Sequence, residues 1–166
     1  MKTRIAWIAA GIMMLLALAS PQQAQAVGAG EKSLGIMGGY SSYNGSGYVS
    51  ANFQWEFANH FRLVPEIGVS FENDHKSAFL LNCDIHFPFQ VYRGIVLYPL
   101  VGLTMNSWHY TWDHADPEYR TRVGGDFGAG VDFYFTRFLK MTLQAKYSAM
   151  AQTSGAFAGI GLSYVF

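Results

Sequence analysis

Ser50-Ala51-Asn52-Phe53-Gln54-Trp55-Glu56-Phe57 alternates between small or polar side chains and apolar ones. A two-residue period places the two kinds of side chain on opposite faces of a β-strand. Ala58-Asn59-His60 then marks a tight turn, and the alternation resumes over 61–71. The stretch therefore predicts an antiparallel hairpin with one apolar face and one polar face.

The same pattern recurs along the rest of the chain after a short polar lead. The alternating segments are 34–43, 50–57, 61–71, 79–87, 96–106, 127–135, 139–148 and 156–166. They predict eight strands, and the connections between them fall at 44–47, 72–77, 107–122 and 151–154 on one end and at 58–60, 90–95 and 136–137 on the other. Pro65 and Pro99 fall inside strands, where each removes one N–H from the ladder.

The apolar face could line the cavity of a soluble, lipocalin-type barrel or face the lipid of a membrane. Three features favour lipid. Glycines fall on the polar face, which is where an eight-stranded barrel is crowded. Aromatic residues gather near strand ends, and the chain closes on Gly161-Leu162-Ser163-Tyr164-Val165-Phe166, whose aromatic end suits an interfacial girdle. We therefore predict an all-β fold, an eight-stranded antiparallel transmembrane β-barrel, with Cys83 among the lipid-facing residues.

The beginning of the chain has the three parts of a secretory signal peptide. A basic start is followed by an apolar run over 5–19 and by the small-x-small site Ala24-Gln25-Ala26. An uncleaved anchor is the alternative, although the run is short for a spanning helix. We expect a signal peptide over 1–26 and one barrel domain over 27–166. An even number of strands then places both ends of that domain in the periplasm.

Charge and cysteine content narrow the class of protein. Lys2 and Arg4 are two of the eleven Lys and Arg, so nine remain against eleven Asp and Glu in the mature chain. No basic patch indicates nucleic acid as a partner. Cys83 is the single cysteine and cannot form an internal disulfide. Stability must come from elsewhere, and a barrel in lipid supplies it because every strand edge is paired.

Several segments carry a family resemblance. They are Arg62-Leu63-Val64-Pro65-Glu66, Tyr98-Pro99-Leu100-Val101-Gly102-Leu103, Gly128-Ala129-Gly130-Val131-Asp132-Phe133 and the terminal Gly161, Tyr164 and Phe166. In their order and spacing the chain resembles the small outer-membrane β-barrel domain proteins of Gram-negative bacteria, porin-like or OmpA-type. The resemblance covers the mature chain. It implies the fold and the location but not the function, because one fold can carry many functions.

The resemblance also implies partners. Gly161, Tyr164 and Phe166 look like the signal that the barrel-assembly machinery reads, although Gly159 stands where a polar residue is common. Outer-membrane lipids and lipopolysaccharide are the other expected partners of what we expect to be a monomer.

Charged residues on the polar face form the first candidate site. They are Glu56, Arg62, Glu66, Asp84, His86, Asp132, Lys140 and Lys146. Symmetry about the turns predicts that Glu56 faces Arg62 and that Asp132 faces Lys140. It also places Glu66 near Asp84, with Lys146 or His86 as the neighbouring cation. We interpret the set as the structural filling of a narrow interior. A proton pathway or a catalytic dyad is the alternative.

The long connection near the second half of the chain is the other candidate. Its possible surface-recognition residues are Trp108, His109, Trp112, Tyr119, Arg120 and Arg122. Such side chains can meet lipopolysaccharide headgroups or solvent. His109 and His114, with nearby carboxylates and with Glu72, Asp74 and His75 of the second loop, could instead hold a metal, but the spacing matches no ligand signature.

The sequence predicts no chemistry of the protein's own. Ser107, His109 and Asp113 could form the trio of a lipid-A-modifying enzyme, but no nucleophile motif surrounds them. We expect an integral outer-membrane protein with a structural or surface-interaction role, not an enzyme, without cofactor or metal. A lipid-A-modifying enzyme and a small-solute pore are the alternatives.

Overall fold

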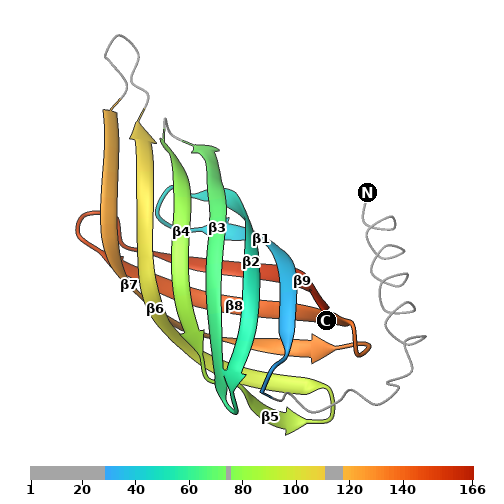
Figure 1. Ribbon diagram of the computed structural model, residues 1–166. Coiled ribbons are helices and arrows are strands. Elements are labelled where there is room, and N and C mark those ends of the chain that lie inside the picture. The colour runs from blue at the N-terminus through green and yellow to red at the C-terminus, as the bar shows by residue number, and fades with distance from the viewer. Residues whose placement is uncertain (1–28, 74–75, 111–117) are drawn as a thin grey trace, which may run out of the picture.

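The computed structural model describes residues 29–73, 76–110 and 118–166, with the side chains of 76, 110 and 118–120 excepted. The described chain folds as one closed antiparallel sheet (Figure 1). No helix in these residues is long and apolar enough to cross a membrane. The predicted signal peptide, 1–26, lies outside the described residues.

Eight long strands make the barrel wall. They are β1 (Lys32–Ser41), β2 (Ser46–Ala58), β3 (Phe61–Asn73), β4 (Lys76–His86), β6 (Ile95–Tyr110), β7 (Glu118–Tyr134), β8 (Leu139–Met150) and β9 (Gly155–Val165). A ninth, short strand, β5 (Phe89–Tyr92), continues β4 and pairs with the start of β6. The pairing of β1 with β9 and of β4 with β6 closes the sheet. The predicted eight-stranded antiparallel barrel is therefore confirmed.

The two ends of the barrel differ. The start of β1, the end of β9 and the turns at 59–60, 93–94 and 135–138 lie at one end, here the termini end. The connections from β1 to β2, β3 to β4, β6 to β7 and β8 to β9 lie at the other, here the loop end. β6 and β7 run far toward the loop end in Figure 1.

The prediction of a long loop over 107–122 is wrong for most of that range. β6 continues to Tyr110 and β7 begins at Glu118, with backbone pairing that reaches from Ser107 opposite Thr121 to Tyr110 opposite Glu118. Aromatic residues in both segments, together with Thr121 in the second, favour extended backbone, so the ladder continues where the apolar alternation ends. The predicted turn over 90–95 is also shorter, because β5 extends to Tyr92.

The turn between β7 and β8 is longer than predicted. Thr136 Oγ1 accepts hydrogen bonds from the N–H groups of Phe138 at 3.2 Å and Leu139 at 3.1 Å. This turn therefore spans four residues, 135–138, and not the two predicted at 136–137. The register moves by two residues, so that Asp132 faces Thr142.

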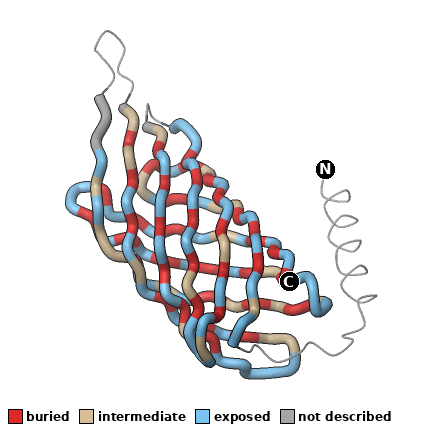
Figure 2. The backbone as a smooth tube through the Cα atoms, viewed as in Figure 1, coloured by how far each residue is buried: buried red, intermediate tan, exposed pale blue. Residues whose placement is uncertain are grey.

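Inside and outside follow the sequence alternation. Buried and exposed residues alternate along every long strand in Figure 2. Leu80 is 2% exposed and its neighbour Leu81 is 41% exposed, although the side chains are identical. Most of the large outward residues are apolar, and most of the buried inward residues are polar or charged. The outside of the barrel is thus the apolar face, and Cys83 is exposed on it.

Inward glycines make room for large interior side chains. Gly130 stands opposite Tyr98, and a Cβ there would overlap the Tyr98 hydroxyl. Gly128 stands opposite Lys146, and a Cβ there would lie 2.8 Å from the Lys146 Cβ. The glycines on the polar face are therefore needed so that the aromatic and charged side chains can fit in the interior.

Candidate functional site

All eight of the predicted inward charges are buried inside the barrel. Six of them form two ion-paired groups at different levels: the Arg62 cluster contains Glu56, Arg62 and Asp132, and the Lys146 cluster contains Glu66, Asp84 and Lys146. Lys140 and His86 belong to neither group. A third group, of apolar side chains, lies nearer the loop end, and we call it the apolar cap. The interior is therefore layered along the barrel.

The Arg62 cluster lies at the termini end. Arg62 donates to Glu56 Oε1 from Nη2 at 2.7 Å and from Nε at 3.0 Å. It also donates from Nη1 to Asp132 Oδ2 at 2.6 Å, and Thr142 Oγ1 donates to the other Asp132 oxygen at 2.6 Å. Glu56 faces Arg62 across the β2–β3 hairpin. Asp132 takes its cation from β3, on the other side of the barrel, so the prediction that Lys140 faces it is wrong.

Lys140 has a different partner. Its Nζ donates to Glu31 Oε1 at 3.3 Å, and the Tyr134 hydroxyl donates to the same oxygen at 2.7 Å. Glu31 precedes β1 and was not predicted from the sequence. Ser33 is buried, and Glu31 lies two residues before it, so extending the alternation by one step would have identified it.

His86 is stacked in the same region. Its ring lies 4.4 Å from that of Tyr98 with an interplanar angle of 6°. The Arg62 guanidinium is 5.6 Å from the Tyr98 ring centroid, and the Tyr98 hydroxyl donates to Gln144 Oε1 at 3.0 Å. Neither ring nitrogen of His86 has a hydrogen-bond partner among the described residues. His86 therefore acts here as a packed ring and is not the cation beside Glu66 and Asp84.

The Lys146 cluster lies at mid-height. Lys146 Nζ is 3.1 Å from Glu66 Oε2, 3.0 Å from Asp84 Oδ2 and 3.1 Å from Asp126 Oδ2. One ammonium therefore faces three carboxylates from β3, β4 and β7. Asp126 was missed because the predicted strand began only at Phe127. The outward parity of Phe127 already indicates an inward residue before it.

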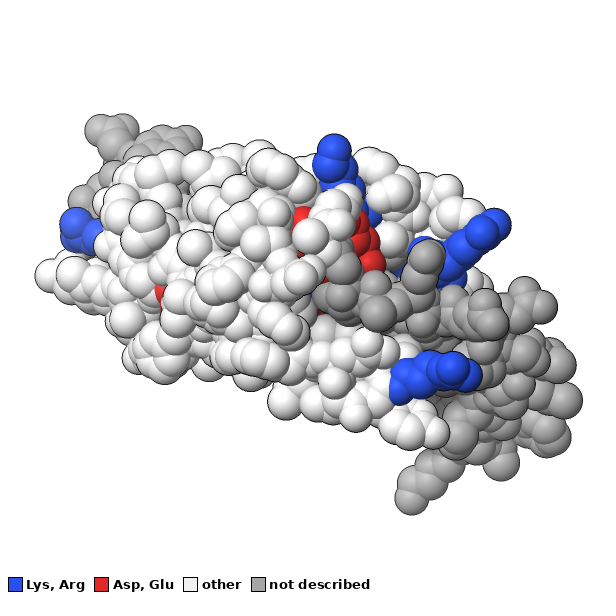
Figure 3. Space-filling view, turned by 60° about the horizontal axis from the view of Figure 1, so that its bottom comes forward, with Lys and Arg blue, Asp and Glu red and all other residues white. Residues whose placement is uncertain are grey.

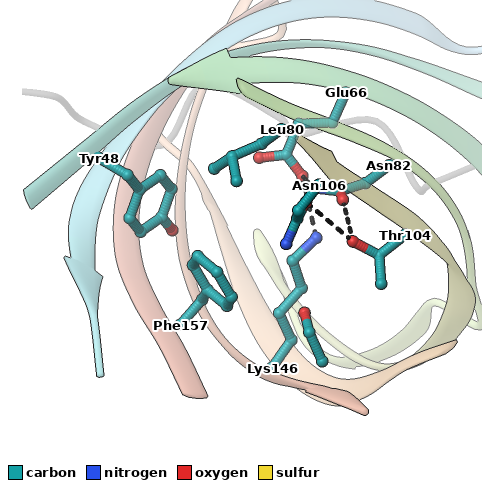
Figure 4. Close-up of a pocket in the computed structure, with 9 residues that line it drawn as sticks. Tyr48, Glu66, Leu80, Asn82, Thr104, Asn106, Lys146 and Phe157 are labelled. Carbon is teal, nitrogen blue, oxygen red and sulfur yellow. Dashed lines mark hydrogen bonds and ion pairs between the residues drawn. The ribbon is translucent and has the colours of Figure 1, made fainter. Parts of the chain in front are cut away.

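Little free space remains around Lys146. Figure 4 shows its ammonium pointing toward Glu66 and the polar side chains of Asn82 and Thr104, with Tyr48 and Phe157 on the other side. The residues around it leave no space wide enough for a water molecule. The interior at this level is closed by side chains.

The apolar cap lies between the Lys146 cluster and the loop end. It consists of Met37, Tyr48, Ala78, Leu80, Trp108 and Phe157, with Tyr43 packed against it. The Tyr43 and Trp108 ring centroids are 4.5 Å apart. Trp108 is 0% exposed, so its prediction as a surface-recognition residue is wrong. Its position in β6 has inward parity, which the loop prediction concealed.

The other predicted recognition residues are spread over two strands. His109 is partly exposed on β6, and Arg122 on β7 donates to Gln152 Oε1 at 3.0 Å. Tyr119 and Arg120 lie on β7 opposite His109 and Trp108, and their side chains are not described. Trp112 lies outside the described residues.

Two chemical alternatives also have residues near the loop end. Ser107 and His109 are both partly exposed on β6, and Asp113 lies outside the described residues. Asp74, His75 and His114 also lie outside them. Within the described part of the chain, no three His, Cys, Asp or Glu side chains are arranged to hold a metal ion.

The predicted assembly signal lies on β9 beside β1. Gly161 stands opposite Met37, and Tyr164 stands opposite Leu34. Tyr164 is 57% exposed and Phe166 is 62% exposed, and their ring centroids are 6.4 Å apart. The terminal aromatic side chains therefore lie on the outside of the barrel at the termini end.

Solved structures share this architecture. The N-terminal β-barrel domain of Pseudomonas aeruginosa OprF matches with a TM-score of 0.74 and 15% identity, over 84% of this chain and 100% of that one. The attachment invasion locus protein Ail of Yersinia pestis matches with a TM-score of 0.64 and 18% identity, over 83% and 99%. The fold is that of the small outer-membrane β-barrels.

Neisserial surface protein A is similar in the same way, with a TM-score of 0.63 and 12% identity over 82% of this chain and 96% of that one. No family model matches the sequence, and no curated protein matches it. At these identities the likeness concerns the fold alone, so the role of this chain has to be argued from its own residues.

Proposed function

We propose that the protein is an integral outer-membrane β-barrel with a structural or surface-interaction role. In this arrangement the termini end lies in the periplasm and the loop end faces outward. The observation that carries the proposal is the reversal of ordinary burial. Large apolar side chains cover the outside while Arg62, Lys140 and Lys146 are enclosed within it.

The outer surface fits a bilayer. Exposed Leu, Ile, Val and Phe side chains occur on all eight long strands. A soluble protein rarely exposes a continuous apolar surface of this extent. Lipid requires that backbone groups be paired within the protein, and a closed antiparallel sheet pairs them. Aromatic side chains at the termini end, among them Phe57, Phe61 and Phe138, match an interfacial girdle.

The interior supports a structural role over a pore. Two charged clusters and the apolar cap occupy successive levels of an eight-stranded barrel, whose interior is only wide enough for side chains. The carboxylates of both clusters are held by Arg62 and Lys146 at hydrogen-bonding distance. Ion pairs of this kind specify one arrangement of a narrow interior.

Surface interaction would take place at the loop end. Function on rigid scaffolds is concentrated in the connecting segments. The connection between β6 and β7 spans 111–117, longer than the four residues between β1 and β2. We propose that this connection contacts lipopolysaccharide and outer-membrane lipids. The barrel-assembly machinery would be the partner during insertion, and the inserted protein would be a monomer.

Fractionation of cells that produce the full chain tests the proposal. The protein should be in the outer-membrane fraction, resist extraction with salt and alkali, and migrate faster on a denaturing gel before boiling than after it. Because every strand edge is paired, the barrel stays folded in detergent until it is boiled, and the compact folded form migrates faster than the unfolded chain. Recovery as soluble periplasmic material would contradict the membrane assignment.

The surface role has its own test. Residues 111–117 are replaced with a short Gly-Ser turn, and a control variant carries Gln in place of Arg93, which is exposed in the turn between β5 and β6 at the termini end. The proposal expects the replacement variant to keep the gel shift but to behave like the gene deletion, and the control variant to behave like the native protein. A folded replacement variant that behaves like the native protein would contradict a role for this segment.

A further inference from the structure

Two exposed cations flank the end of β9 at the termini end. Lys32 begins β1, and Arg137 lies in the turn between β7 and β8. The Phe166 N–H donates to the Lys32 carbonyl at 2.9 Å, and the Val165 N–H donates to the Phe138 carbonyl at 2.8 Å. β9 therefore ends directly between the segments that carry the two cations. Figure 3 shows blue Lys and Arg side chains projecting from this half of the molecule.

A row of stacked aromatic rings runs along the outer wall from Arg137 to Phe166. The Phe138 and Tyr164 ring centroids are 6.0 Å apart with an interplanar angle of 12°. Tyr164 and Phe166 follow at 6.4 Å and 23°. The Arg137 guanidinium lies 4.5 Å from the Phe138 centroid, which fixes it over one end of the row. Neither Lys32 nor Arg137 forms an ion pair within the described residues.

The wall is hollowed next to this aromatic row. An apolar groove of about 320 Å³ is lined mainly by Leu34, Ile36, Ala51, Leu139, Leu162 and Tyr164. Tyr164 stands opposite Leu34 on one side and Leu139 on the other, so it belongs to both the row and the groove. Toward the termini end, the outer wall thus carries the apolar groove, then the aromatic row, then the two cations.

We propose that this surface binds an anionic phospholipid, with an acyl chain in the groove and the headgroup against Lys32 and Arg137. The proposal rests on the membrane placement proposed above, which sets the termini end at the periplasmic leaflet. Amphipathic aromatic rings suit the headgroup level, and the long stems of Lys and Arg let their charges reach it. A guanidinium and an ammonium both donate to phosphate oxygens. A headgroup without a cation of its own leaves the phosphate charge uncompensated, which strengthens the attraction to both Lys32 and Arg137.

Native mass spectrometry of the refolded full chain tests the site. Detergent micelles carry equal amounts of phosphatidylglycerol and phosphatidylcholine, and the lipids retained by the protein are counted. The native chain should prefer phosphatidylglycerol by roughly tenfold or more, at about 1 kcal/mol per cation. The K32Q/R137Q variant should lose this preference, and the charge-preserving K32R/R137K variant should keep it. R122Q is the control at the loop end and should also keep it.

The groove is tested separately. Ala51→Phe fills it and should reduce retention of both lipids, whereas Ala145→Phe, on the outer wall outside the groove, should not.

Equal retention of the two lipids by the native chain, or an unchanged preference in K32Q/R137Q, would overturn the proposal. Displacement of the lipid by soluble glycerol phosphate at equal concentration would also overturn it, because the groove would then contribute nothing. The gel shift on boiling reports folding of each variant. Micelle binding does not depend on cellular location, so failure here and failure of fractionation are distinguishable.

Discussion

Replacing Lys146 with Met should be among the most destabilising single changes in the interior. The ammonium lies 3.0–3.1 Å from carboxylate oxygens of Glu66, Asp84 and Asp126, and all three side chains are almost fully buried. Met fills a similar volume but leaves three carboxylates without a cation. Loss of one partner from a buried ion pair costs about 3–5 kcal/mol. We therefore expect a loss of about this size in the free energy of unfolding.

Glu66→Gln is the matched comparison. Lys146 then keeps two carboxylates, and the Gln amide oxygen can still accept a hydrogen bond, so the expected loss is about 1 kcal/mol. Equilibrium unfolding in urea, followed by tryptophan fluorescence and by the gel shift, measures both. Adding Asp84→Asn and Asp126→Asn to Lys146→Met should recover part of the loss, because it removes two of the three unpaired charges. Equal losses for Lys146→Met and Glu66→Gln, with no recovery in the triple variant, would refute the reasoning.

Further changes probe the other levels of the barrel. Trp108→Ala empties the middle of the apolar cap and should cost about 3–5 kcal/mol in the same unfolding assay; a loss below 1 kcal/mol would show that the cap is not packed. Gly130→Val should cost about 1–3 kcal/mol because its side chain meets Tyr98, whereas Gly125→Ala, with its nearest atom 3.7 Å away, should cost little. Planar-bilayer recordings of the native protein should show no stable open steps, and large reproducible steps would contradict a filled interior. Removing Tyr164–Phe166 should lower the amount of assembled, heat-modifiable protein in cells, and unchanged assembly would exclude these residues from the signal.

The number of strands and their faces could be predicted from the sequence because both depend on local alternation. Leu80 and Leu81 have the same side chain, yet their neighbours on the strand decide that one faces in and the other out. The charged residues that alternate with apolar ones could only point inward once lipid was assigned to the apolar face. Glu56 and Arg62 lie close to one short turn, so their pairing also followed from local symmetry.

Strand length and register could not be predicted in the same way. The side-chain hydrogen bonds of Thr136 lengthen one turn and move Lys140 opposite Tyr134. The extension of β6 and β7 toward the loop end depends on pairing between 107–110 and 118–121, where apolar alternation is absent. Trp108 therefore looked like a loop residue although it lies inside the barrel.

Contacts across the barrel could not be predicted from the symmetry of the hairpins. Arg62 reaches Asp132 from β3 to β7, strands that are not neighbours in the sheet. Lys146 likewise gathers carboxylates from three strands. Such contacts depend on how the sheet closes, and this depends on strand number, tilt and stagger together.

The central claim is that the apolar outer face meets lipid, and Cys83 offers the most direct test. It is the only cysteine of the chain and lies exposed on β4. A fluorophore attached to Cys83 in the folded protein in phospholipid vesicles should be quenched by lipids that carry a quencher on the acyl chain and protected from iodide in the water. A second site on the outer face, Leu81→Cys in a Cys83→Ser background, should behave alike. Quenching by iodide without quenching by lipid would contradict the account.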